Sequence, residues 1–198
     1  MKKIIMLLCM QTVGAFITPY VSAQSFTSIQ YTVGIPFGGL KEHTDNVSGR
    51  GFTFEFHKEV APSLSVGVNL AYSVFYEKKP YGSYNSGNAT LTGTQYRYNN
   101  LFPMLVNAHY TFGESLIVPY VGLGIGTVYD LRNTDMGMYT IEEYNWHFLI
   151  SPELGCLIDI SSGTSIKLNA KYDNAFKIHD ADGFGNLNLS LGFVFNSW

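Results

Sequence analysis

Leu64-Ser65-Val66-Gly67-Val68-Asn69-Leu70-Ala71-Tyr72-Ser73-Val74 alternates an apolar residue with a small or polar one along its whole length. Successive side chains of a β-strand point to opposite faces, so this stretch predicts a strand with one apolar face and one polar face. The turn-forming segment Ala61-Pro62-Ser63 directly precedes it and marks where the strand begins.

The same alternation recurs in seven further stretches. They cover residues 28–35, 52–57, 95–111, 117–129, 144–159, 165–173 and 187–196. Helical spacing of apolar residues is hard to find, and after residue 23 no apolar run is long enough for a membrane-spanning helix. The pattern therefore predicts an all-β fold of eight strands.

The segments between these stretches alternate in length. Those at 61–63, 113–115 and 161–163 are tight turns, whereas those at 37–49, 77–94, 130–142 and 176–184 are long and rich in Gly, Asn, Tyr and charge. In an up-and-down arrangement of antiparallel strands, this alternation places every long loop at one end. No linker or repeat divides the chain, so we expect a single domain.

The composition is poor in charge and rich in aromatic residues. Of 198 residues, 14% are charged, 15% aromatic and 46% hydrophobic, and the formal net charge is -3. Soluble domains carry about 25% charged residues. An acidic chain lacks the basic face that nucleic-acid binding needs, so we expect no nucleic-acid partner. Its apolar content also excludes a disordered chain.

The first residues have the layout of a secretory signal peptide. Lys2 and Lys3 precede an apolar stretch over residues 4–17, and Val21-Ser22-Ala23 forms a site of small residues suited to cleavage. We therefore predict a signal peptide at 1–23 and a barrel domain at 24–198. Cys156 is then the one remaining cysteine, so the exported chain is not a disulfide scaffold.

Two kinds of barrel fit eight alternating strands: a soluble barrel with its apolar face inward, and a transmembrane barrel with its apolar face toward lipid. The scarcity of charge, the aromatic residues near the strand ends and the alternation of short and long connections favour the second kind. We predict an all-β, eight-stranded antiparallel up-and-down transmembrane β-barrel.

This choice assigns the two faces of the strands. The side chains expected to face lipid are Phe52, Phe54, Phe56, Val66, Val68, Leu70, Val121, Leu123, Ile125, Leu187, Leu189, Leu191 and Phe193. A polar hydrogen-bonded network is expected in the lumen, from Glu55, His57, Arg97, His109, His147, Glu153, Lys167, Lys171 and Asp173. Eight strands enclose a space that side chains just fill, so we expect no continuous channel.

The alternating stretches and the closing segment 185–198 give the chain its family resemblance. Together they resemble the small eight-stranded outer-membrane β-barrels of Gram-negative bacteria, a porin-like class whose last strand typically ends on an aromatic residue. The resemblance implies location in the outer membrane, contact with outer-membrane lipid, insertion by the barrel-assembly machinery and possible outer-membrane complex partners. Trp198 is out of phase with Phe193 and Phe195, so a bulge or a departure from the strand is expected there.

Some barrels of this class are enzymes, so the polar residues are candidates for a catalytic or metal-binding site. His147 and Ser151 lie about 13 Å apart along a strand, beyond hydrogen-bonding reach. His109 and Thr111 are closer, but no orienting acid is evident, and the His-x-Ser pattern of lipid A deacylase barrels is absent. The segment 180–183 lacks the further ligands of a calcium loop. We therefore expect no catalytic residues, no metal and no cofactor.

The sequence thus favours a non-enzymatic outer-membrane barrel with a structural, adhesive or complex-subunit role, acting through its extracellular loops, and with a lumen filled by polar side chains. Three alternatives stay open: a small pore or apolar-solute conduit, a lipid-modifying barrel enzyme, and a secreted soluble ligand-binding barrel. Fold alone does not decide between these roles.

Overall fold

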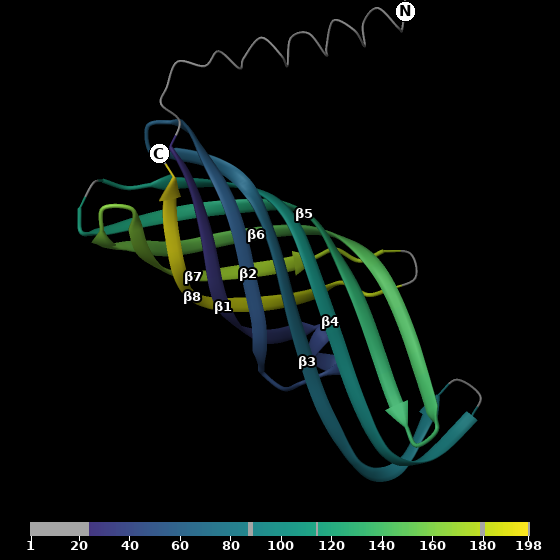
Figure 1. Cartoon of the computed structure of the whole chain (residues 1–198). Helices are drawn as coiled ribbons and strands as arrows, with labels where there is room; N and C mark the ends of the chain where they lie inside the picture. Colours follow the sequence, from purple (N-terminus) through teal and green to yellow (C-terminus); the bar gives the residue numbers. More distant parts are fainter. Residues whose placement is uncertain (1–23, 87–88, 114, 179–180, 198) are drawn as a thin grey trace, which may run out of the picture.

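The computed structural model of the chain describes residues 24–86, 89–113, 115–178 and 181–197. Eight antiparallel strands form a closed barrel in which each strand pairs with the next in sequence, and β1 pairs with β8 (Figure 1). The strands are β1 (Ser25–Gly38), β2 (Ser48–Ala61), β3 (Leu64–Ser86), β4 (Ala89–Thr111), β5 (Ile117–Met136), β6 (Tyr139–Ser161), β7 (Thr164–Ala175) and β8 (Phe184–Ser197). The predicted fold class is confirmed. The predicted signal peptide, 1–23, and Trp198 lie outside the described residues.

The pairing of β1 with β8 closes the sheet. It runs without a register shift from Ser25 opposite Ser197 to Gly38 opposite Phe184. A closed sheet has no unpaired edge, and in a bilayer every backbone polar group must find its partner within the protein. Closure therefore satisfies the main requirement for an all-strand protein in lipid.

The two faces of the strands divide as a membrane barrel requires. On the outer face Val68, Leu123 and Leu189 are exposed, whereas on the inner face Asn69 and Asn188 are buried. A lipocalin-type barrel has the opposite arrangement, with its apolar face lining the interior. The side-chain orientation therefore excludes the soluble-carrier alternative and, with this fold, places the chain in the outer membrane.

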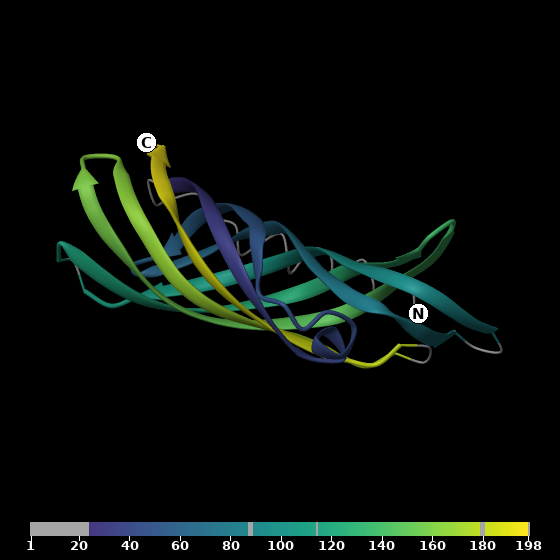
Figure 2. The same cartoon turned by 90° about the horizontal axis from the view of Figure 1, so that it is seen from below.

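The prediction of long loops at 77–94 and 130–142 is wrong, because both segments are mainly β-strand in the structure. The pairing of β3 with β4 continues to Ser86 opposite Ala89, and that of β5 with β6 continues to Met136 opposite Tyr139. The two hairpins also pair with each other as far as Gln95 opposite Met136. Figures 1 and 2 show this four-stranded extension projecting well beyond the rest of the barrel.

We call this extension the external sheet. It comprises residues 76–86 of β3, 89–98 of β4, 133–136 of β5 and 139–142 of β6. Aromatic pairs across its strands, such as Tyr76 with Tyr98 at 5.0 Å between ring centroids, add to the backbone ladder. Such side-chain pairs stabilise a hairpin outside the membrane, which is why these segments stay extended.

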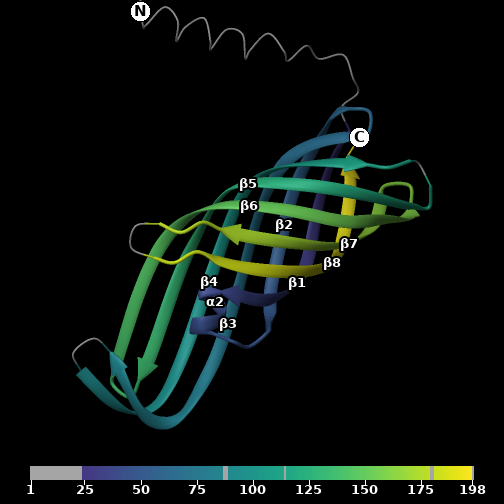
Figure 3. The same cartoon turned by 180° about the vertical axis from the view of Figure 1, so that it is seen from behind.

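The connection between β1 and β2 folds back toward the barrel instead of projecting from it. It contains the short helix α2 (Gly39–His43), which packs against β1, β8 and β4 (Figure 3). Leu40 of this helix is fully buried. Within the described part of the chain, no helix has the length and apolar character needed to cross a bilayer.

Candidate functional site

The barrel interior has two layers of different chemistry. Near the long connections, α2 contributes to an apolar cluster formed by Leu40, Phe75, Leu101, Leu105, Val128, Leu149, Ala175 and Phe184. Near the short turns the interior is polar and charged. The outer half of the interior thus combines this apolar cluster with buried polar side chains such as Asp130 and His147, so polar side chains fill only part of it.

Glycines on the inner face of β5 make room for large side chains from β4. A Cβ on Gly124 would lie 3.2 Å from Leu105 Cδ1, and one on Gly122 would lie 2.5 Å from the ring of His109. The register places His109, Gly122 and Glu153 in one row across β4, β5 and β6. Because Gly122 has no side chain, His109 and Glu153 can meet across the intervening strand.

The polar layer centres on a buried ion-pair group that we call the lumen cluster: Glu55, His57, His109, Tyr120, Glu153 and Lys167. Lys167 Nζ donates to Glu55 Oε2 and lies 3.2 Å from Glu153 Oε1, so one ammonium bridges two carboxylates. All six side chains are buried. Charges removed from water in this way must be paired and hydrogen-bonded to persist.

Neutral donors complete the coordination of the two carboxylates. Ser28 Oγ and Gln30 Nε2 each donate to Glu55 Oε2 at 3.1 Å, and Asn69 Nδ2 donates to Oε1 at 2.5 Å. Glu153 Oε1 accepts the Tyr120 hydroxyl and, at 2.7 Å, Asn169 Nδ2. The charges of Glu55 and Glu153 are thus satisfied by groups from four other strands, β1, β3, β5 and β7.

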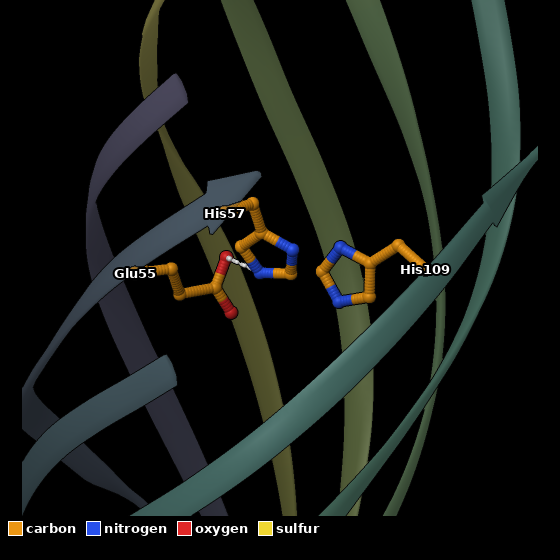
Figure 4. A group of neighbouring side chains, drawn as sticks. All are labelled: Glu55, His57 and His109. Carbon is orange, nitrogen blue, oxygen red and sulfur yellow. Dashed lines mark ion pairs between the residues drawn. The ribbon is translucent and has the colours of Figure 1, made fainter. Parts of the chain in front are cut away.

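The two histidines of the lumen cluster stack on each other, with ring centroids 4.2 Å apart and an interplanar angle of 27° (Figure 4). His57 Nε2 lies 4.0 Å from Glu55 Oε2 and has no hydrogen-bond partner among the described residues. His109 Nε2 lies 3.6 Å from Glu153 Oε2. One donor atom from each of Glu55, His57 and His109 lies within 4.8 Å of the other two.

The remaining residues of the predicted lumen network separate into other groups. Lys171 Nζ reaches the lumen cluster through Asn69 Oδ1, at 3.3 Å. Asp173 accepts hydrogen bonds from Ser151 at 2.6 Å and Asn188 at 2.7 Å. The structure therefore places Asp173 beside the lumen cluster rather than within it.

His147 and Arg97 lie farther toward the long connections. His147 Nδ1 donates to the Phe176 carbonyl at 3.0 Å, and its Nε2 lies 3.9 Å from Asp130. Arg97 Nη1 donates to the carbonyls of Glu42 and His43, at 3.3 and 3.2 Å, and so contacts α2. The set expected as one network is thus divided along the barrel axis.

The hydroxyl candidates from the sequence have no catalytic partner among the described contacts. Ser151 donates to Asp173, and Thr111 Oγ1 donates to the Ser63 carbonyl at 3.3 Å. Sequence reasoning missed Glu153 as the acid beside His109, because the two residues lie on strands that are not neighbours. The alternating glycines of β5, which leave room for side chains from the strands on either side, were the feature of the sequence that could have indicated this contact.

A hollow of about 300 Å³ lies at the mouth of the barrel beside α2 and is lined by Gly39, Glu42, His43, Arg132, Glu143, Asn145, Ala181 and Asp182. Burial, together with the nearby positive charges of Arg132 and Arg97, lowers the pKa of His43 from 6.5 to about 4. The imidazole is therefore neutral when α2 is docked at pH 7.

Acidification is expected to weaken the docking of α2. A released His43 binds a proton near pH 6.5, whereas the docked one does so only near pH 4, so docking loses stability as the pH falls through this window. Amide hydrogen exchange in residues 40–44, corrected for intrinsic rates, should accelerate from pH 7 to pH 4. In the variant His43→Gln, the acceleration of exchange between pH 7 and pH 4 should vanish. If the variant accelerated as much as the wild-type protein, protonation of His43 would not be the cause.

The residues predicted to face lipid all lie on the outer face of their strands. Eleven are exposed, namely Phe52, Phe56, Val66, Val68, Leu70, Val121, Leu123, Ile125, Leu189, Leu191 and Phe193. Phe54 and Leu187 are half-buried, each between two inward-facing residues. Together these side chains form an apolar belt around the barrel.

Comparison with known proteins identifies the fold. No protein-family model matches the sequence, and no curated protein matches it. Among solved structures, the attachment invasion locus protein Ail of Yersinia pestis, in complex with the heparin analogue sucrose octasulfate, aligns with a TM-score of 0.57 and 13% identity, covering 89% of this chain and 100% of that one. The outer membrane protein OprG of Pseudomonas aeruginosa aligns with a TM-score of 0.55 and 12% identity, covering 88% of this chain and 96% of that one.

The outer membrane protease OmpT of Escherichia coli also aligns, with a TM-score of 0.50 and 8% identity, covering 92% of this chain and 100% of that one. Identities this low establish the fold and not the role, because related barrels carry different functions. The chain is a small eight-stranded β-barrel of the outer-membrane type.

Proposed function

We propose that this outer-membrane β-barrel is a non-enzymatic surface protein that binds a protein partner through its external sheet. One observation carries the proposal: the paired strands continue far beyond the barrel and expose large side chains at their tips. Tyr81 is 76% exposed, Tyr139 64% and Met138 98%. Exposed aromatic and methionine side chains are the groups enriched at the centres of protein interfaces.

The composition of the tip supports protein recognition. Residues 80–96 consist mainly of Tyr, Ser, Gly, Asn and Thr. Antibody paratopes use the same residues, because tyrosine supplies a large contact at low conformational-entropy cost and the small polar residues supply hydrogen bonds. In the described part of this segment the strands are already paired, which reduces the backbone entropy lost on binding.

The charge at the mouth favours a protein over a sulfated glycan. The Ail structure contains a heparin analogue, and a polysulfate requires a basic surface. Here the mouth presents Glu42, Glu143 and Asp182 together with Arg132. A surface of mixed sign suits complementary contacts with a protein, which also carries both signs.

The interior supports neither a pore nor an enzyme. Leu40 and Phe75 are fully buried in the apolar cluster across the outer half of the lumen, where an aqueous channel would have to pass. Ser151 and Thr111 are engaged away from the histidines. Outer-membrane lipid around the belt and the barrel-assembly machinery during biogenesis are expected as further partners.

Photocrosslinking in intact cells tests the proposal. A photoreactive phenylalanine at Tyr81 or Tyr139 should give one protein adduct of the same identity from both sites. The same probe at Tyr110, which is exposed near the short turns, is the matched control and should not give it. Absence of a shared adduct at the tips, or the same adduct at Tyr110, would contradict the proposal.

Substitution at the tip should also weaken binding. With the probe at Tyr144, the double variant Tyr81→Ser/Tyr139→Ser should lower the adduct yield at least about tenfold, because a single interface anchor contributes roughly 2 kcal/mol. Heat-modifiable migration on a gel should be unchanged, since both residues lie outside the barrel. An unchanged adduct yield would exclude the external sheet as the binding surface.

A further inference from the structure

We propose that Glu55, His57 and His109 form a binding site for a single divalent transition-metal ion of the zinc class. This site is separate from the external sheet and does not depend on the protein-binding role. It lies in the half of the lumen near the short turns, where the polar layer is.

The donor set is the first observation behind this inference. Imidazole nitrogen and carboxylate oxygen are zinc ligands, and two histidines with one or two carboxylates form a common set. One donor atom from each of Glu55, His57 and His109 lies within 4.8 Å of the other two. Glu153 Oε2 lies 3.6 Å from His109 Nε2, next to this group.

The second observation is an unpartnered nitrogen. His57 is fully buried, yet its Nε2 has no hydrogen-bond partner among the described residues and faces Glu55 (Figure 4). A buried polar atom without a partner is costly. Ser65 Oγ lies 3.4 Å from His57 Nδ1, and a hydrogen bond at Nδ1 leaves Nε2 as the nitrogen free to bind a metal.

The geometry requires only a small adjustment. Donors around a tetrahedral zinc ion lie about 3.4 Å apart, given a bond length of about 2.1 Å. Separations of up to 4.8 Å within the group therefore need to shorten by up to roughly 1.4 Å. Rotation of the side chains about their χ torsions can supply this shortening while the strands stay in place.

The charges limit how tightly the ion binds. The two carboxylates carry two negative charges, and Lys167 already neutralises one of them by contacting both. A divalent ion must share Glu55 with this ammonium, so its affinity should be lower than in a closed structural zinc site. The histidine nitrogens favour zinc, nickel or copper over magnesium and calcium, which prefer oxygen ligands.

Metal titration of the intact, tag-free barrel tests the proposal. The EDTA-treated protein in nanodiscs is dialysed against zinc chloride, and bound metal is counted by mass spectrometry. One zinc per chain is expected, with no binding of magnesium or calcium at the same concentration. Wild-type protein that binds less than one zinc per ten chains, or binds magnesium equally, would overturn the site.

Three histidine variants locate the ion. His57→Gln and His109→Gln should each weaken zinc binding at least tenfold, whereas His147→Gln should not change it. His147 is the matched control, because it is equally buried and its Nε2 also has no partner among the described residues, but it lies in another layer. Equal loss in all three variants, or in none, would place the metal elsewhere.

A measurement on the wild-type protein tests the site even if the histidine variants fail to fold. X-ray absorption at the zinc edge should show two imidazole ligands together with oxygen ligands. A spectrum with oxygen ligands alone would overturn the proposal, whatever the variants do.

Discussion

Replacing Lys167 with methionine is expected to destabilise the barrel by about 3–5 kcal/mol, which is the usual cost of removing one partner from a buried ion pair. Lys167 Nζ contacts Glu55 and Glu153, and both carboxylates are almost completely buried. Methionine fills a similar volume but leaves two like charges in a low-dielectric interior. Reversible urea unfolding in lipid vesicles, followed by tryptophan fluorescence and heat-modifiable migration, measures the free energy of unfolding.

Lys171→Met is the matched control for this prediction. Lys171 lies on the same strand and is also buried, but its ammonium donates to the neutral side chain of Asn69. Its loss should cost clearly less, about 1–2 kcal/mol. The triple variant Glu55→Gln/Glu153→Gln/Lys167→Met should recover much of the lost stability, because it removes the unpaired charges together. Equal costs for Lys167→Met and Lys171→Met would contradict the bridging role.

Replacing Leu123 with arginine should destabilise the folded barrel by about 2–4 kcal/mol, the cost of a basic side chain near the bilayer midplane. Leu123 is exposed on the outer face of β5, halfway along the part of the strand that lies within the barrel. Its side chain is expected to contact acyl chains, which cannot solvate a guanidinium. The same unfolding assay in vesicles measures the effect.

Met138→Arg provides the comparison at an exposed site that is not in lipid. Met138 lies at the β5–β6 tip of the external sheet and is almost fully exposed. Arginine should change the free energy of unfolding there by less than about 0.5 kcal/mol, as surface substitutions usually do. Similar costs at Leu123 and Met138 would mean that the outer face of β5 does not contact lipid.

The strands and their inward and outward faces could be predicted because they depend on local sequence. The alternation in residues 64–74 is a period of two, and it fixes the face on which Val68 and Asn69 lie once one face is buried. The polar content of the inner face then decides between lipid and water outside the barrel. These arguments need no knowledge of which strands pair.

The contacts within the lumen could not be predicted because they depend on register. His109 and Glu153 meet only because the pairing aligns both with Gly122 on the strand between them. The apolar cluster in the lumen was not predicted for a related reason. Leu101 and Leu149 occupy inward positions, and alternation alone gives no reason for leucine there. Leu40, which packs with them, lies in the connection between β1 and β2, where the sequence has no periodic pattern from which a fold could be predicted.

The external sheet was missed because its segments have the composition of loops. Residues 77–94 contain Gly, Pro, Asn and Ser, which ordinarily indicate turns. Cross-strand pairs such as Tyr76 with Tyr98, together with the pairing of the two hairpins, extend the ladder through them. Non-local pairing of this kind overrides the local preference.

The most direct test of the barrel's orientation is the contact between individual methyl groups and lipid. In nanodiscs with protonated acyl chains, methyl-labelled protein should show nuclear Overhauser effects from lipid CH₂ groups to Val68, Leu123 and Leu189. The methyl groups of Leu105, Val128 and Leu149, all buried inside the barrel, should show none. Lipid contacts at the second set, or at neither set, would contradict a barrel that turns its apolar belt toward the membrane.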